Sequence, residues 1–210
     1  MDLWRKRQAY GDVIVVRYAD DTVLGFQYQP EADRFLEDLR QRLAKFGLEL
    51  HPDKTRRIEF GRYAQERREK RGEGKPETFD FLGFTHISGK YRSGTFIVRR
   101  RTNAKRLRSK LHEIKQHLRR RRHEPVALTG KWLRSVVQGY FNYHAVPGNL
   151  NSLRTFRNRL TQLWHAQLLR RSHRRRLTWE RMDRQADRWL PTPRVLHPWP
   201  ITRFAAHHPR

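Results

Sequence analysis

The chain has 210 residues, no cysteine and a formal net charge of +26. The absence of cysteine excludes disulfides and thiolate zinc sites, and we expect a reducing, cytoplasmic setting. No apolar run approaches the roughly 20 residues that a membrane-spanning helix requires, so no membrane partner is expected. A soluble protein with a strongly basic surface is the class that remains.

The positive charge is confined to one part of the chain. Residues 1–84 hold 17 Lys and Arg against 16 Asp and Glu, whereas residues 85–210 hold 30 against 5. Such a surplus requires a polyanion nearby, and nucleic acid is the one we expect because Trp, Tyr and Phe alternate with the basic residues. An anionic membrane surface or a ribosome-like setting is the alternative.

The first hundred residues predict a mixture of short strands and one helix. Residues 13–26, "VIVVRYADDTVLGF", predict two strands around a tight turn. Residues 30–47 have the apolar spacing of an amphipathic helix, opened by proline and closed by glycine. Residues 48–60 predict two short strands, 61–77 an exposed loop, and 78–100 two further strands.

From Thr102 onward the apolar period becomes helical. Thr102 is placed to cap a helix whose inner stripe is Leu107, Leu111, Ile114 and Leu118. Further helices are predicted at about 128–145 and 150–170, with a short fourth one before the tail, and the Trp residues are predicted to be mainly core. The fold class is therefore α+β, with expected domains at 1–100 and 101–190 and a proline-rich tail at 191–210.

Two adjacent carboxylates, Asp20 and Asp21, lie at the tip of the first predicted hairpin. Transfer of a nucleotide to a nucleic-acid 3′ end commonly uses two Mg²⁺ ions, which prefer carboxylate oxygens. Aspartate is also a common turn residue, so the pair alone leaves an ordinary turn open as the alternative.

The motif "YADD" between apolar strands resembles the active-site hairpin of reverse transcriptases, in the spelling typical of those encoded by group II introns. Four later blocks follow in the family's order. "LAKFGLELHPDKTR" resembles its next palm motif, and "FDFLGF" the hairpin that grips the primer. "WLRSVVQGYFNYHAVPGN" resembles its thumb or maturase region, and "LTWERM…RWLPTPRVLHPWPITRF" its closing segment. The fold implied is a partial palm followed by a basic helical thumb/maturase bundle.

The resemblance assigns roles at the matching positions. It implies that Asp20 is the principal Mg²⁺ ligand of a two-metal site, with Asp21 beside it, and that Lys54 acts on the triphosphate of the incoming nucleotide. It implies primer or nucleotide contacts for Tyr18, Ala19, Leu82 and Gly83. An exposed lysine and a plain turn glycine are the alternatives for Lys54 and Gly83. The implied partners are an RNA template, a DNA primer and group II intron RNA.

Clusters of arginine and lysine in the rear part of the chain are the candidate RNA contacts. They alternate with the apolar helix positions or follow the helix ends, where they could reach phosphates. For any single residue, a solvated surface side chain is the alternative. The candidates are Arg99, Arg100, Arg106, Lys110, Arg119, Arg120, Arg170, Arg171, Arg174 and Arg175.

Members of the family carry a further catalytic aspartate on an earlier palm strand. Asp2 and Asp12 are the only carboxylates before the motif, and Asp12 opens the hairpin strand itself. We therefore expect a C-terminal half of such an enzyme, inactive alone. It could derive from a split gene, a truncated gene or a misplaced start codon. A separately encoded N-terminal half would be the missing partner. The alternative is a noncatalytic, maturase-like RNA-binding module.

Overall fold

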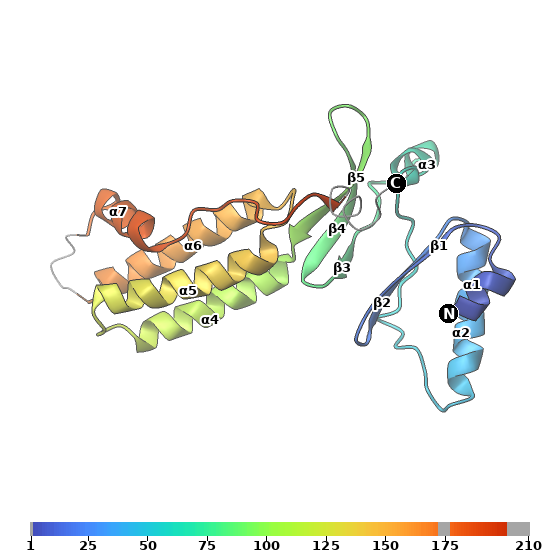
Figure 1. The fold of residues 1–210 in the computed structure, drawn as a ribbon, viewed down its shortest axis with the longest axis horizontal. Coiled ribbons are helices and arrows are strands. Elements are labelled where there is room, and N and C mark those ends of the chain that lie inside the picture. The colour runs from blue at the N-terminus through green and yellow to red at the C-terminus, as the bar shows by residue number, and fades with distance from the viewer. Residues whose placement is uncertain (1, 172–176, 201–210) are drawn as a thin grey trace. The chain divides into compact units, whose positions relative to one another are not determined.

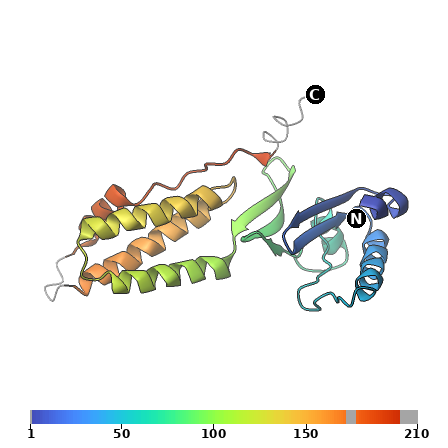
Figure 2. The same ribbon diagram turned by 60° about the horizontal axis from the view of Figure 1, so that its bottom comes forward.

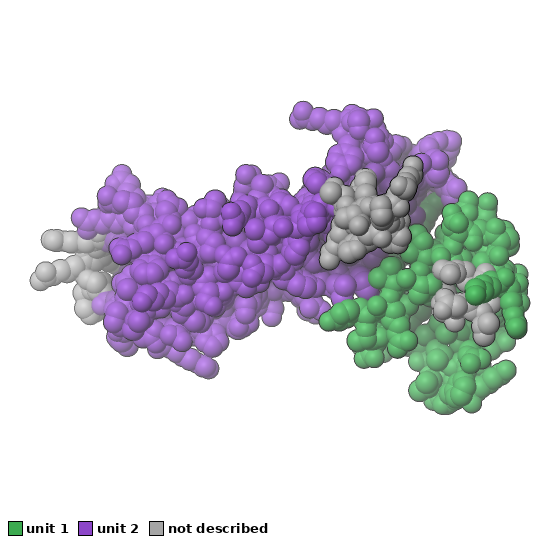
Figure 3. Space-filling view, in the orientation of Figure 1, with its two compact units in different colours: residues 1–59 green, residues 60–210 purple. Residues whose placement is uncertain are grey.

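A computed structural model describes residues 2–171 and 177–200 of the chain. The chain forms two compact units, residues 1–59 and residues 60–210 (Figure 3). Seven helices and two antiparallel sheets lie within the described ranges (Figure 1), which confirms the predicted α+β class. The boundary expected near residue 100 lies inside the second unit. Across these ranges, every helix is too short or too polar to cross a bilayer.

The first unit contains two helices and a two-stranded hairpin. The helices are α1 (Asp2–Gln8) and α2 (Gln29–Ala44), and the predicted hairpin consists of β1 (Val13–Tyr18) and β2 (Asp21–Phe26). Pro30 lies at the start of α2, and Gly47 follows its end with a φ of 67°, as the sequence predicted.

A small aromatic cluster holds α1, α2 and the hairpin together. The rings of Trp4 and Phe35 lie 4.9 Å apart edge to face, and Phe26 lies 5.5 Å from Phe35. The Trp4 indole also donates to Asp38 at 2.7 Å. The two short strands predicted for residues 48–60 do not form. A strand needs a neighbour to pair with its backbone, and in the described part of the chain this segment has none.

The second unit begins with a short helix and a three-stranded sheet. The helix α3 (Ala64–Lys70) forms where the sequence predicted a loop. It buries Ala64, and Lys70 pairs with Glu66 one turn earlier at 2.9 Å. The sheet has the order β3 (Phe79–Phe81), β4 (Phe84–Lys90), β5 (Phe96–Thr102), with antiparallel neighbours throughout.

The rest of the second unit is helical. The three long helices α4 (Ala104–Arg120), α5 (Val126–His144) and α6 (Leu150–Leu169) run alongside one another, and α7 (Trp179–Trp189) packs on α5 and α6 (Figures 1 and 2). Asn103, not Thr102, caps α4, because its side chain accepts from the Arg106 amide while Thr102 is still paired in β5.

The core of this unit lies between the helices. Ile114 and Leu118 are buried there with Leu107 and Leu111 packed beside them, which confirms the stripe predicted for α4. Trp164 is fully buried and Trp132 and Trp189 pack against the core, as predicted. The prediction was wrong for Trp179, which is 52% exposed at the start of α7, where its ring contacts His165 instead.

Two glycines of α5 stand in opposite environments. A Cβ on Gly130 would lie 2.5 Å from the indole of Trp189, so that ring packs directly on the helix backbone at Gly130. A Cβ on Gly139 would meet nothing within 4 Å. The first glycine is explained by packing, and the second is not.

Gly130→Ala should therefore destabilise the protein and Gly139→Ala should stabilise it. Overpacking against Trp189 should cost about 1–3 kcal/mol, whereas alanine at an open mid-helix position should contribute about 0.5–1 kcal/mol. Urea unfolding followed by tryptophan fluorescence measures both. Equal midpoints for the two variants would contradict the packing of α7 described here.

Candidate functional site

The hairpin tip consists of two residues with a defined backbone shape. Tyr18 pairs with Asp21 at the ends of β1 and β2, so Ala19 and Asp20 form the turn between them. Ala19 has a φ of 49°, which lies in the left-handed region that tight hairpin turns require. The Arg17 side chain donates to the Ala19 carbonyl at 3.1 Å and so supports this turn.

Asp20, in the turn, and Asp21, the first residue of β2, are both exposed. Among the described residues, neither the Asp20 nor the Asp21 carboxylate has a hydrogen-bond or ion-pair partner. Adjacent carboxylates of this kind suit a hard cation such as Mg²⁺. The described ranges nevertheless contain no group of three or more acidic or histidine side chains that could enclose a metal ion. Among the described residues, the pair by itself therefore has too few ligands to enclose a metal ion.

The two faces of the hairpin differ. Phe26 packs on α2 through Phe35, so that face is covered. Ile14, Val16 and Tyr18 share the other face because alternate residues of a strand point the same way. They are 65%, 44% and 64% exposed, respectively. Within the described ranges, an apolar face and two unpaired strand edges therefore lie beside the aspartates.

The base of the hairpin is anchored by a buried carboxylate that the sequence reasoning did not identify. Glu31, in the first turn of α2, is 1% exposed. One of its oxygens accepts from the amides of Tyr10 and Gly11, at 2.7 and 3.2 Å. A Cβ on Gly11 would come within 2.7 Å of Tyr28. Helix α2 thus determines where β1 begins and so positions the tip.

Lys54 lies in the turn after α2, where its amide and that of Thr55 approach the His51 carbonyl at 3.3 and 2.9 Å. Its side chain is exposed and forms no ion pair with either aspartate of the tip in the described structure. The structure therefore places Lys54 in the same unit as the pair without joining them.

The Leu82–Gly83 turn between β3 and β4 is held by the helices. Leu82 and Gly83 both have left-handed backbones, with φ of 49° and 77°. The Leu82 carbonyl accepts from the Tyr143 hydroxyl of α5 at 2.7 Å, and the Gly83 carbonyl accepts from the backbone amide of Asn103 at 2.9 Å. A side chain at Gly83 would contact Arg106, Tyr143 and His144. The turn is thus fastened to the ends of α4 and α5.

Burial shifts the pKa of two histidines and a tyrosine in the second unit. It lowers the pKa of His86 and of His144, in each case against weaker hydrogen bonds to backbone, and it raises the pKa of Tyr140 to about 12. His144 stacks on Tyr140 at 4.1 Å and lies near Gly83. The two histidines are therefore favoured in the neutral form by the fold.

The second unit should lose stability in acid. A histidine with a lowered folded-state pKa stabilises the fold above its unfolded pKa, and this contribution is lost as the pH falls through the folded value. The urea midpoint should thus drop between about pH 7 and about pH 5. His144→Gln should weaken this dependence, and the exposed His123→Gln should not. Identical pH profiles for all three proteins would contradict it.

The candidate RNA contacts divide into engaged and exposed side chains. Arg99 donates to the Lys90 carbonyl at 2.7 Å, Arg100 is half-buried, and Lys110 pairs with Glu113 at 2.8 Å. Burial lowers the pKa of Arg100. Five other candidates are exposed, three of them near the ends of α4 and two directly after α6. These are Arg106, Arg119, Arg120, Arg170 and Arg171. Arg174 and Arg175 lie outside the described residues.

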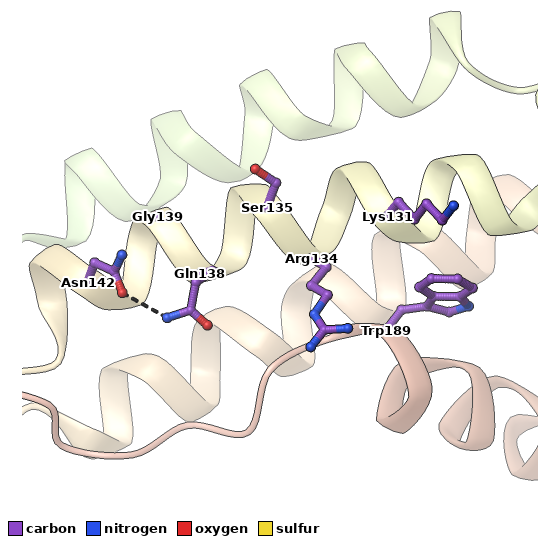
Figure 4. Close-up of a pocket in the computed structure, with 7 residues that line it drawn as sticks. All are labelled: Lys131, Arg134, Ser135, Gln138, Gly139, Asn142 and Trp189. Atoms are coloured by element: carbon purple, nitrogen blue, oxygen red, sulfur yellow. Dashed lines mark hydrogen bonds between the residues drawn. The ribbon is translucent and has the colours of Figure 1, made fainter.

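A groove along α5, lined mainly by polar residues but with more apolar than polar exposed area, was missed by the sequence reasoning. We call it the α5 groove; it has a volume of about 650 Å³ (Figure 4). It is lined by Lys131, Arg134, Ser135, Gln138, Gly139, Asn142 and Trp189. The signal in the sequence is a second periodicity: the α5 members recur every three or four residues, on the face opposite the apolar stripe.

The comparisons with known proteins concern the first part of the chain. Residues 1–86 match a family model described as reverse transcriptase (RNA-dependent DNA polymerase). This stretch contains the hairpin with Asp20 and Asp21, Lys54 and the Leu82–Gly83 turn. No curated protein matches the chain.

Proposed function

We propose that the chain is a reverse transcriptase/maturase of the group II intron type, which supports intron splicing and mobility. One observation carries the proposal: the stretch that matches the reverse transcriptase family contains a hairpin whose tip presents Asp20 and Asp21 to solvent. RNA-directed DNA synthesis is the reaction of that family, and two carboxylates at a turn are suited to it.

The Asp20 and Asp21 carboxylates would hold the Mg²⁺ of this reaction. Their oxygen donors, exposure and lack of other partners fit a hard cation. The two ions of such a site would supply activation of the primer 3′ oxygen and stabilisation of the leaving pyrophosphate. Tyr18 and Ala19 would shape the floor beside the primer end, and Lys54 would stabilise charge on the triphosphate. Leu82 and Gly83 would contact the primer strand.

A polypeptide carrying the fingers and the first palm strands would complete the polymerase site. Two features support this partner. The tip supplies two carboxylates where a two-metal site uses more. The Ile14, Val16 and Tyr18 face, with its free strand edges, also offers a surface on which a further sheet could pack.

The second unit would bind the RNA. It holds 36 Lys and Arg against 10 Asp and Glu, whereas the first unit holds 11 of each. The basic side chains lie on a well-packed helical scaffold, so they can follow a phosphate backbone at little ordering cost. Group II intron RNA is the partner we propose, together with an RNA template and a DNA primer.

A noncatalytic, maturase-like RNA-binding module is the second candidate. The observation that favours it is the contrast between the units. The helical unit has its own buried core around Trp164 and Phe156, and no residue of the hairpin belongs to this core. RNA binding could therefore persist without DNA synthesis.

Primer extension and RNA binding together test the proposal. The chain is mixed with a separate polypeptide carrying the fingers and first palm strands of a group II intron reverse transcriptase, in Mg²⁺. DNA synthesis on an RNA template should exceed that of either polypeptide alone. RNA affinity of the chain should fall steeply with salt, because phosphate contacts release counterions. RNA binding without synthesis favours the module, and a salt-independent or absent affinity overturns both candidates.

A further inference from the structure

We propose that the α5 groove binds an unpaired segment of RNA and contacts its base edges as well as its phosphates. This rests on the proposed RNA-binding function and assigns it a site of its own, apart from the basic ends of α4. Four features of the groove carry the inference: its charge, a pair of amide side chains, an open glycine and a fixed aromatic wall.

The charge of the groove suits a phosphate backbone. Lys131 and Arg134 are exposed, one helical turn apart on α5, and neither forms an ion pair within the described ranges. None of the residues that line the groove is acidic. Both cations therefore remain available for phosphates. They lie about 5 Å apart along the helix, so their long side chains can contact neighbouring phosphates of one strand.

The amide pair suits a base edge. Gln138 Nε2 donates to Asn142 Oδ1 at 2.7 Å (Figure 4), which orients both side chains. Gln138 Oε1 and Asn142 Nδ2 are left as an acceptor and a donor with no partner in the described structure. Amide oxygens and nitrogens of Asn and Gln are the groups that hydrogen-bond to base edges; here the mutual bond leaves one such group on each residue, and each can make a single contact to a base. In RNA these edges are accessible where the strand is unpaired.

Gly139 lies between the two amides and has no structural explanation. A glycine in a helix interior costs about 1 kcal/mol relative to alanine, and nothing lies within 4 Å of where its Cβ would be. Elsewhere on the same helix, Gly130 makes room for Trp189. At Gly139 the missing side chain only keeps the groove open, which allows a base or ribose to approach the helix backbone.

Trp189 forms a rigid wall of the groove. One face of its indole rests against Gly130, its Nε1 donates to Gln185 at 3.3 Å, and the Arg188 guanidinium lies 5.3 Å from the ring centre. The ring is therefore held in place before any ligand arrives. A fixed aromatic wall beside charged and amide side chains distinguishes this face from a merely solvated one.

Filling the groove without changing its charge tests the proposal. Gly139→Leu should raise the Kd for a short single-stranded RNA of mixed sequence by about tenfold, and it should leave the slope of affinity against salt unchanged. Leucine is a good helix former, so the variant should melt no lower than the parent protein. Ala166→Leu, at an exposed position of α6, is the matched control and should bind as the parent does.

The contacts are then separated by their salt dependence. Arg134→Ala should reduce the salt slope by about one. Gln138→Ala with Asn142→Ala should weaken binding at an unchanged slope and alter the base preference. If Gly139→Leu binds RNA normally while Arg106→Ala and Arg119→Ala lose affinity, the groove proposal fails and the proposed function stands. If the protein with Gln138→Ala and Asn142→Ala loses as much affinity for an RNA duplex of the same length as for the single strand, the proposed contact to base edges is overturned. No RNA binding by the parent overturns the proposed function itself.

Discussion

Asp20→Asn will lower primer extension by the chain, combined with the fingers and first palm strands, by about 1,000-fold or more. Coordination of Mg²⁺ by this carboxylate is worth several kcal/mol of transition-state charge stabilisation, and about 4 kcal/mol corresponds to that factor in rate. The amide keeps the size of the side chain but removes its charge. Asp20 has no partner in the described structure, so the fold should not change. Single-turnover primer extension in Mg²⁺ measures the effect.

Asp12→Asn is the matched control for this prediction. Asp12 is also exposed and lies at the base of the same hairpin, where its backbone carbonyl accepts from the Gln27 amide at 3.1 Å. It should retain the activity of the parent protein. Asp20→Asn should also retain full RNA affinity, since the basic second unit is untouched. An active Asp20→Asn protein would refute the role of the YADD tip as a metal site.

Asn149→Ala will destabilise the second unit by about 3–5 kcal/mol. Asn149 is 1% exposed and connects the end of β5 to the start of α6. Its Oδ1 accepts from the Thr102 amide at 2.9 Å, and its Nδ2 donates to Thr102 Oγ1 and to the His144 carbonyl, both at 2.8 Å. Alanine would remove the partner of the buried Thr102 amide and hydroxyl and one of the two donors to the His144 carbonyl, which also accepts from the Val146 backbone amide at 2.8 Å. Urea unfolding of the parent and variant proteins measures the loss.

Two further variants show whether the lost hydrogen bonds or the lost side-chain volume causes the destabilisation by Asn149→Ala. Asn149→Asp has the same shape and can still accept from the Thr102 amide, but it donates neither of the other two bonds, so it should also be strongly destabilised. Asn158→Ala, at an exposed position of α6, should change the free energy of unfolding by less than about 0.5 kcal/mol. A stable Asn149→Asp protein would contradict the network.

Local pattern was sufficient where a segment carries its own signal. The hairpin over residues 13–26, helix α2 and the inner stripe of α4 all formed as predicted, because their apolar periods distinguish a strand from a helix without reference to distant residues. The prediction of two strands over residues 48–60 was wrong for the complementary reason. A strand forms only when another strand pairs with it, and the composition of this segment does not show whether such a partner exists. The loop predicted at 61–77 contains α3 because i,i+4 pairs and burial of Ala64 support a short helix there.

The candidate site shows the same division. The exposed position of Asp20 and Asp21 could be predicted because a turn between strands places its own residues at a tip, while their role is implied only by the resemblance of "YADD" to the hairpin of the family. The role of Glu31 could not be predicted, since it depends on the amides of Tyr10 and Gly11 some twenty residues earlier. The cap of α4 shifted from Thr102 to Asn103 because Thr102 is bound by Asn149, which is distant in sequence.

By itself, the sequence determined the α+β class and the hairpin over residues 13–26, which follow from local apolar period, and the excess of positive charge in the rear part of the chain, from which we expect a polyanionic partner. The tertiary structure alone decided what the two α5 glycines do, how the Leu82–Gly83 turn is fastened to α4 and α5, and that Gln138, Gly139 and Asn142 line an open groove. The physical reason is that packing and hydrogen bonding join residues that are far apart along the chain, and no local pattern records which of them meet.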